Sequence, residues 1–578
     1  MSAAPVHGWL EPRKLVPLLV ALAAPALAWA GPAAKQRRGD AATEAGLRIY
    51  RDGTLPGGRP LRASAQSGTA RTGADAACAG CHRRSGFGTS EGPIAIPSVT
   101  ASALFGWSEA APPRPAPVAA RGMAPANRAV AEQAGLLAAR RARIASAQGA
   151  RRRPPYDDAS LARAIRDGVD VTGRPLGGGM PRYALGDREM KALLAYLRTL
   201  STSPAPGVTA EELHLATVIE PGVDPARRRA VLEVLQAFVH DKNAGTRSEE
   251  QRRAAGIERE YRAYRTWVLH VWDVSGPAET WERQLEALYR RQPVFALVGG
   301  LGSSSWSPVH RFSERNGIPC LFPQADLPAT EAGFYTVYLS RGLPLEAEAL
   351  AKHLRGRKSR AGITQVFRRD EAGAAAAAAF RRAMPPGTDL EDRVLEGTAS
   401  RGFWDRLARE RPGSILVLWV RAGDLAEAGT LVERGPEGES IYLSSTLLGA
   451  SRPDLAYDAR ARLVHPLDLP RMREARLLRV KRWLRERGIA VVDEQAQMNA
   501  YFAVAVTADA VTHMSDLFSR EYLVERIEHM VGNTVTPSIY PRVSLGPDQR
   551  FASKGSFIVK LAGRGTDALE PVSEWVTP

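Results

Sequence analysis

Short apolar runs alternate with amphipathic stretches from residue 212 onward. The runs have strand length and are bounded by turn residues, so we expect strands at 213–219, 267–272, 294–298 and 319–322. Between them, residues 225–240 and 281–290 repeat apolar side chains every three or four positions, which predicts helices. Alternation of strand and helix is typical of a parallel sheet with helices on both faces.

The same alternation then occurs a second time. Strands are expected at 363–367, 414–419 and 441–443, and helices at 345–354 and 374–382. Two sheets in succession predict two lobes. Helices at 494–514 and 517–529 are expected to return across both lobes.

Residues 208–562 resemble the type I periplasmic binding-protein fold, the receptor family related to branched-chain amino-acid binding proteins. The match is carried by the run from Ala296 to Ser304, by Pro308-Val309-His310 and by Gly317-Ile318-Pro319. These segments indicate a strand, a turn of small residues, the start of a helix and the lead into another strand. The resemblance implies a two-lobed α/β module that binds a small, amino-acid-like molecule.

Polar side chains at the ends of the predicted strands are the candidate ligand contacts. Ligands of open parallel sheets bind beyond the carboxyl ends of the strands. The loop from Gly299 to Ser305 would offer backbone N–H groups and hydroxyls at a helix N-terminus, which suits a carboxylate; a tight turn with a serine cap is the alternative. The candidates are Ser303, Ser304, Ser305, Gln324, Asp326, Trp419, Arg421 and Ser444.

The N-terminal part carries a different pattern. Helices are expected near residues 41–52, 161–169 and 187–200. Between the first two lies Cys78-Ala79-Gly80-Cys81-His82, which has the C-x-x-C-H spacing of a covalent haem attachment site. Both thiols can bond to haem vinyl groups, and His82 follows as the proximal iron ligand. A redox dithiol or half of a zinc site is the alternative, but the sequence offers no further zinc ligands at short spacing.

Residues 40–202 resemble a class I cytochrome c domain, an all-α fold whose first and last helices cross. The elements that match are Gly46 and Tyr50 in the first helix, the C-x-x-C-H motif, the Gly-Met-Pro-x-Tyr loop and the closing helix. The resemblance implies one covalent haem c, with His82 and Met180 as axial iron ligands. An arm at 109–154, rich in Ala, Pro and Arg, separates these two residues more widely than in small cytochromes and supplies Met123 as a rival distal ligand.

Residues 1–30 have the organisation of a secretory signal peptide. Arg13 and Lys14 precede an apolar run that ends at Ala28-Trp29-Ala30, small residues that suit cleavage. The run is short for a membrane span, although a retained anchor is the alternative. We therefore expect a periplasmic protein without a stable membrane span.

Cys320, the third cysteine, lies in an apolar run and is expected to be a buried, inert thiol.

The formal net charge of +16 does not indicate a nucleic-acid partner. The arginines are dispersed and often lie beside acids, whereas nucleic-acid binding requires a clustered basic stripe. Residues 203–207 read as a linker, and residues 563–578 as a tail.

Together these patterns predict an exported protein with a cytochrome c domain followed by a two-lobed module. Its expected function is one-electron transfer with a periplasmic redox partner. The small-molecule-binding module would dock that partner or regulate the transfer. The protein is expected to be a carrier and binding protein rather than an enzyme. The alternatives are the haem subunit of a periplasmic dehydrogenase and the substrate-binding receptor of a transport system with an accessory cytochrome.

Overall fold

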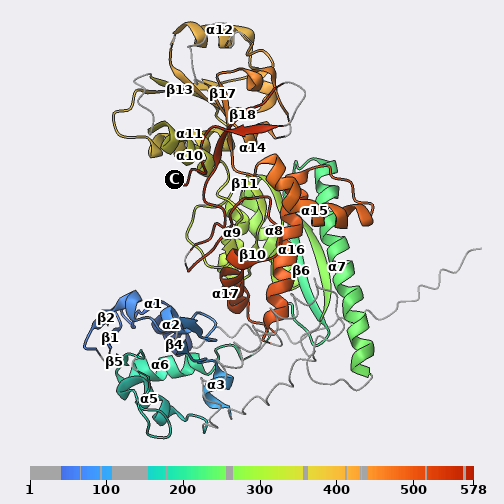
Figure 1. The fold of residues 1–578 in the computed structure, drawn as a ribbon. Coiled ribbons are helices and arrows are strands. Elements are labelled where there is room, and N and C mark those ends of the chain that lie inside the picture. The colour runs from blue at the N-terminus through green and yellow to red at the C-terminus, as the bar shows by residue number, and fades with distance from the viewer. Residues whose placement is uncertain are drawn as a thin grey trace, which may run out of the picture.

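The computed structural model divides the chain into an N-terminal domain and two lobes (Figure 1). It describes residues 41–578 except for 66, 92–93, 107–153, 178, 203, 255–264, 356–361, 411–412, 430, 432–440, 450, 515–516, 548 and 564–567. The signal peptide at 1–30, most of the arm at 109–154 and Met123 lie outside the described residues. Among the described helices we find none with the length and hydropathy that a membrane span requires.

The N-terminal domain is built around two helices that pack directly against each other, α1 (Ala41–Asp52) and α6 (Asp187–Leu197). Gly46 allows this close approach, because a Cβ atom there would lie 2.0 Å from the carbonyl oxygen of Ala192. Helix α5 (Asp158–Asp167) begins with a capping box in which Asp157 accepts from the Ser160 backbone N–H. Two short helices complete the set, α2 (Cys78–His82) and α3 (Ala101–Phe105).

The resemblance implied an all-α domain, but the structure also contains short β-strands here. It contains an antiparallel sheet of β1 (Arg62–Ser64), β2 (Ala70–Thr72) and β5 (Arg182–Tyr183), and a hairpin of β3 (Thr89–Glu91) and β4 (Ile94–Ile96). The first sheet joins a loop before the C-x-x-C-H motif to the segment after Met180, since Ala63 pairs with Tyr183. Segments far apart in the sequence are thereby fixed beside one another.

The first lobe is a parallel sheet. Its main strands lie in the order β7-β6-β8-β10-β12, so the first strand along the chain has the second and third as neighbours. These strands are β6 (Glu212–Ile219), β7 (Thr266–Asp273), β8 (Ala296–Val298), β10 (Cys320–Leu321) and β12 (Thr336–Val337). A further pair, β9 (Leu301–Ser305) and β11 (Gln324–Leu327), continues the sheet at the carboxyl end of β6.

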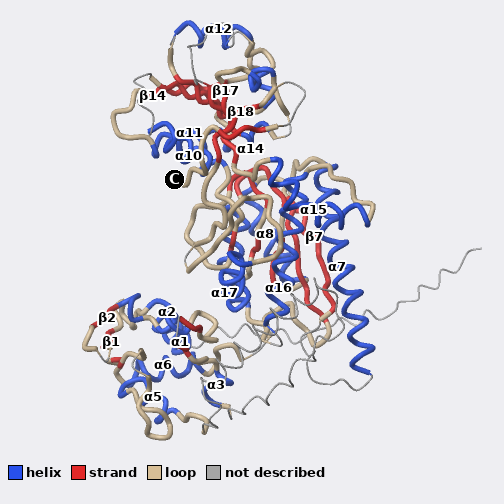
Figure 2. Tube along the Cα trace, in the orientation of Figure 1, coloured by secondary structure: helices blue, strands red, loops and turns tan. Residues whose placement is uncertain are grey.

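Helices cover both faces of this sheet (Figure 2). They are α7 (Pro225–Ala254), α8 (Trp281–Arg291), α9 (Ser307–Asn316), α15 (Pro470–Glu486), α16 (Glu494–Met514) and α17 (Arg520–Met530). Helix α16 is apolar on most of its surface and packs against α7 and the sheet. The last helices therefore belong to the first lobe and do not span both lobes as predicted. Cys320 is fully buried, as expected.

The second lobe repeats the same strand order, β14-β13-β15-β16-β17. These parallel strands are β13 (Ile363–Arg368), β14 (Leu390–Leu395), β15 (Ile415–Trp419), β16 (Ile441–Ser444) and β17 (Ala461–His465). Antiparallel strands β18 (Phe557–Leu561) and β19 (Leu569–Pro571) extend the sheet, so part of the predicted tail is an edge strand. The helices are α10 (Leu343–Arg355), α11 (Glu371–Ala383), α12 (Arg401–Glu410) and α14 (Ser445–Leu448).

The two lobes are joined by neighbouring crossing segments. The Tyr338 backbone N–H donates to the Arg550 carbonyl at 2.8 Å, and Ser553 donates to Leu339 at 2.7 Å. The third crossing is held by the Asp468 backbone N–H, which donates to the Ile539 carbonyl at 2.9 Å. Crossing segments bonded in this way form a compact connection about which two lobes can rotate.

Candidate functional site

The C-x-x-C-H motif forms a helix of its own, α2. Cys78 and Cys81 are three residues apart, so one helical turn brings both thiols to the same side. Burial raises the pKa of the Cys78 thiol to about 12, and Tyr183 lies within hydrogen-bonding distance of that thiol. Burial therefore favours the neutral form of the Cys78 thiol.

His82 is oriented by a backbone carbonyl. Its Nδ1 lies 2.9 Å from the Pro97 carbonyl oxygen, and only 7% of the residue is exposed. Because a carbonyl only accepts, Nδ1 must carry the proton, and Nε2 therefore holds the lone pair. Burial lowers the pKa of His82, which favours the neutral imidazole. This is the usual arrangement around a histidine that binds a metal through its second nitrogen.

Met180 lies in the turn before β5, where its backbone N–H donates to the Gly177 carbonyl at 3.0 Å. Its half-buried side chain packs against the same apolar core as Cys78. The thiols, the imidazole and this thioether form a donor set that suits haem c. By residue type these four side chains would suit the cofactor that the sequence implies, with Cys78 and Cys81 for attachment and His82 and Met180 for the iron.

The predicted carboxylate cradle at Ser303–Ser305 has a different structure. These serines lie on strand β9 and precede helix α9, so they do not form a helix N-terminus. The Glu220 carboxylate already accepts from the backbone N–H groups of Ser303 and Ser304, both at 3.1 Å, and from the Ser304 hydroxyl at 2.7 Å. The Glu220 carboxylate thus takes the position that was expected for the carboxylate of a ligand. Burial raises the pKa of Glu220 to about 7. The sequence did not predict this contact because Glu220, the residue after β6, lies far upstream of these serines.

Ser305 connects the two lobes. Its backbone N–H donates to the Glu371 carboxylate at the start of α11, at 3.1 Å. Gln324 accepts a hydrogen bond from the Asn499 amide on α16. Asp326 is largely buried, and this burial raises its pKa against the opposing charges of Arg227 and Arg421. Ser305, Gln324, Asp326 and Arg421 therefore belong to the region where the lobes meet.

Two predicted ligand contacts, Trp419 and Ser444, make hydrogen bonds inside the second lobe. Trp419 is 1% exposed and donates from Nε1 to the Gln365 side chain at 3.2 Å, inside the second lobe. Ser444 caps α14 and donates to the buried Glu346 carboxylate at 2.6 Å. Side chains alternate across a strand, and the alternation directs Trp419 into the core.

The space between the lobes is small in this structure. A cavity of about 20 Å³ lies there, lined among others by Gln324, Asp326, Thr446, Gln495 and Tyr540. This volume accommodates about one water molecule.

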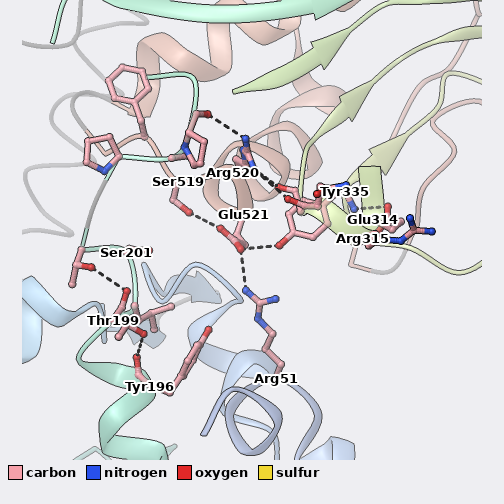
Figure 3. A pocket seen from close by; sticks show the side chains of 18 residues that line it. Arg51, Tyr196, Thr199, Ser201, Glu314, Arg315, Tyr335, Ser519, Arg520 and Glu521 are labelled. Carbon is pink, nitrogen blue, oxygen red and sulfur yellow. Dashed lines mark hydrogen bonds and ion pairs between the residues drawn. The ribbon is translucent and has the colours of Figure 1, made fainter. Parts of the chain in front are cut away.

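A larger cavity, which the sequence did not predict, lies between the N-terminal domain and the first lobe (Figure 3). Its volume is about 540 Å³. At its wall the Glu521 carboxylate accepts from Arg51 at 2.9 Å and from the Tyr335 hydroxyl at 2.8 Å (Figure 3). Arg520 is 7% exposed and donates to five backbone carbonyls, including Pro206 of the predicted linker. No local motif signals this site, since its residues come from distant segments.

Comparison with known proteins gives similarity at the level of solved structures. No protein-family model and no curated protein sequence matches the chain. A fatty acid ABC transporter substrate-binding protein from Thermomonospora curvata is 16% identical, with a TM-score of 0.47 over 65% of this chain and 95% of that one. A branched-chain amino acid ABC transporter from Thermus thermophilus with bound valine is 15% identical, with a TM-score of 0.45 over 64% and 98%.

A leucine binding protein from Thermotoga maritima is 15% identical, with a TM-score of 0.44 over 63% of this chain and 99% of that one. Sequence identities this low do not indicate which ligand this chain binds. The chain's own sheets define residues from β6 to β19 as a two-lobed α/β module.

Proposed function

We propose that the chain is an exported, two-lobed receptor for a small molecule that carries a covalently attached haem on its N-terminal domain. The receptor function rests on one observation: both lobes have the same doubly wound strand order and meet where Ser305 of β9 contacts Glu371. Sheets of this order bind ligands beyond the carboxyl ends of their strands. Two such edges that face each other form a cleft that can close around a ligand.

The proposed ligand is amino-acid-like. Asp326 and Gln324 from the first lobe and Thr446 from the second line the small cavity near the hinge, where the Asp326 carboxylate would bind the ammonium group of the ligand. The pair of Ser303 and Ser304 is engaged with Glu220 and is therefore not proposed as a ligand contact. Valine and leucine, which are bound in solved structures of similar fold, are the first probes.

The test of this proposal is a calorimetric titration of the mature full-length protein with valine, leucine and other amino acids. We expect saturable binding that Asp326→Asn weakens by about tenfold, the loss of roughly one charge-assisted hydrogen bond. The matched control is Glu189→Gln, which alters an ion pair of the N-terminal domain at 2.8 Å from Arg59. Equal affinity in Asp326→Asn and the parent protein would reject this cleft as the binding site.

Electron transfer is the proposed role of the N-terminal domain. The observation that supports this proposal is the hydrogen bond between His82 Nδ1 and the Pro97 carbonyl. Cys78 and Cys81 would hold haem c, and His82 and Met180 would be the protein ligands of its iron. When attached, the haem supplies one reversible electron. The chain orients the imidazole of His82 through the Pro97 carbonyl and keeps it neutral by burial. The proposed donor or acceptor is a periplasmic redox protein.

Covalent attachment is tested with the Cys78→Ala/Cys81→Ala variant. We expect acidified organic solvent to extract the pigment from this variant and to leave it on the parent chain. Cys320→Ser is the control, because this buried thiol lies in the first lobe. Pigment that stays with the double variant would contradict attachment through the C-x-x-C-H motif.

A further inference from the structure

Helix α17 of the first lobe is the surface on which the N-terminal domain lies. Glu521 binds Arg51 of α1, and the next residue, Tyr522, packs its ring against that of Phe87, with centroids 4.4 Å apart. The guanidinium of Arg84 lies 4.4 Å from the centre of the Phe334 ring. Two of these contacts involve the segment that directly follows His82.

Glu525 makes the most buried contact of this interface. Its carboxylate accepts from the Ser85 backbone N–H at 3.1 Å and from the Ser85 hydroxyl at 2.5 Å. Ser85 is fully buried and Glu525 is 8% exposed. A carboxylate with two hydrogen bonds from one residue in such surroundings fixes that residue strongly, because losing either bond would leave a buried polar group without a partner.

Hydrogen bonds connect Ser85 to the imidazole of His82 through its neighbours in the chain. The Gly86 carbonyl accepts from the Val99 backbone N–H at 2.7 Å and from the Ser98 hydroxyl at 3.1 Å. Residue 98 follows Pro97, whose carbonyl holds His82 Nδ1. On the other side, the Gly88 backbone N–H donates to the His82 carbonyl at 3.0 Å. The loop 83–88 is therefore bonded both to His82 and to the segment that orients its ring.

We propose that Glu525 is a positioning residue for the proximal ligand: from the neighbouring domain it holds the loop 83–88 and so sets the orientation of His82. This inference rests on the proposed haem attachment. Groups that orient a ligating histidine tune the properties of the metal it binds. Release of Ser85 therefore changes the environment of the iron, even though Glu525 belongs to the receptor module.

The experiment compares Glu525→Ala with Glu525→Gln in the full-length haem protein. The glutamine loses the charge but keeps an oxygen that accepts from Ser85, whereas alanine removes both acceptors. We expect Glu525→Ala to change the Soret circular dichroism and the midpoint potential of the haem. Glu525→Gln should keep most of the parent Soret signal. His529→Gln, at an exposed position of the same helix, should leave the Soret signal at the parent value.

Ser85→Ala provides a second route should Glu525→Ala fail to fold, because it removes the hydroxyl and leaves the receptor helix unchanged. It should change the Soret signal in the same direction. Parent-like Soret spectra in both Glu525→Ala and Ser85→Ala would overturn the inference, as would equal changes in Glu525→Ala and Glu525→Gln, which indicate a pure charge effect. Absence of covalent haem in the parent protein would instead reject the proposed function itself.

Discussion

Arg51 donates to the Glu521 carboxylate at 2.9 Å, across the boundary between the N-terminal domain and the first lobe. Both side chains are mostly buried, with exposed fractions of 17% and 23%. Tyr335 and Ser519 donate to the same carboxylate, at 2.8 and 3.0 Å. This shared acceptor ties three segments together and explains how a domain on a short linker keeps one orientation.

Replacement of Arg51 by alanine should loosen this boundary. The substitution removes one charge-assisted hydrogen bond from a largely buried carboxylate, which costs about 1–3 kcal/mol. We expect faster hydrogen exchange in the peptide that contains α17, measured by mass spectrometry. Arg59→Ala is the control, since its ion pair with Glu189 leaves Arg59 66% exposed. Unchanged exchange in Arg51→Ala would show that other contacts alone hold the boundary.

Three buried carboxyl groups predict that the free energy of unfolding falls between pH 5 and pH 8. Burial raises the pKa of Glu220, Glu346 and Glu525 to about 7 each. The folded state therefore binds protons more tightly than the unfolded chain, so the stabilisation is complete below the ordinary glutamate pKa and is lost as the pH rises through 7. Each pKa unit corresponds to about 1.4 kcal/mol.

The measurement is urea unfolding at several pH values. Glu346→Gln should flatten the slope because it removes one titrating group, while the exposed Glu279→Gln should not change it. A free energy of unfolding that rises over this range would contradict the raised pKa values of these carboxyls.

Ser444→Ala tests whether this residue serves structure or ligand binding. The hydroxyl donates to Glu346 at 2.6 Å and accepts from the Leu447 backbone N–H at 3.2 Å. Its loss should lower the free energy of unfolding by about 1–3 kcal/mol, as measured by urea titration, and leave ligand affinity unchanged. The exposed Ser451→Ala should alter neither quantity. Weaker ligand binding at unchanged stability would restore the original interpretation of Ser444 as a ligand contact.

Met180→Ala and Met123→Ala separate the two candidates for the distal iron ligand. A thioether favours reduced iron, so Met180→Ala should lower the midpoint potential in a redox titration. Met123→Ala should leave the potential at the parent value. The reverse pattern would assign the ligand to the arm, which lies outside the described residues.

The sequence predicts the strand and helix order well because alternating apolar runs determine it locally. Helix α16 has the predicted bounds, β6 begins one residue earlier than expected, and β7 is one residue longer at each end. The return of α15 to α17 onto a single lobe could not be predicted in this way, because it depends on which sheet offers a matching apolar face.

The binding site was harder to predict than the attachment motif. Cys78, Cys81 and His82 are adjacent in sequence and carry their spacing with them. Glu220 and Ser304 lie far apart along the chain and meet only when β6 and β9 pair at Ile219 and Leu301. The same holds for Glu525 and Ser85. Long-range partners of this kind decide whether a polar strand end is free for a ligand.

The most direct test of the account is a haem assay of the purified full-length protein. After extraction with acidified acetone, the protein is dissolved in alkaline pyridine, reduced, and its absorption spectrum is recorded. The account predicts one haem per chain that stays with the protein and gives the spectrum of haem attached through two thioether bonds. A colourless protein, or pigment that leaves entirely with the solvent, would contradict it.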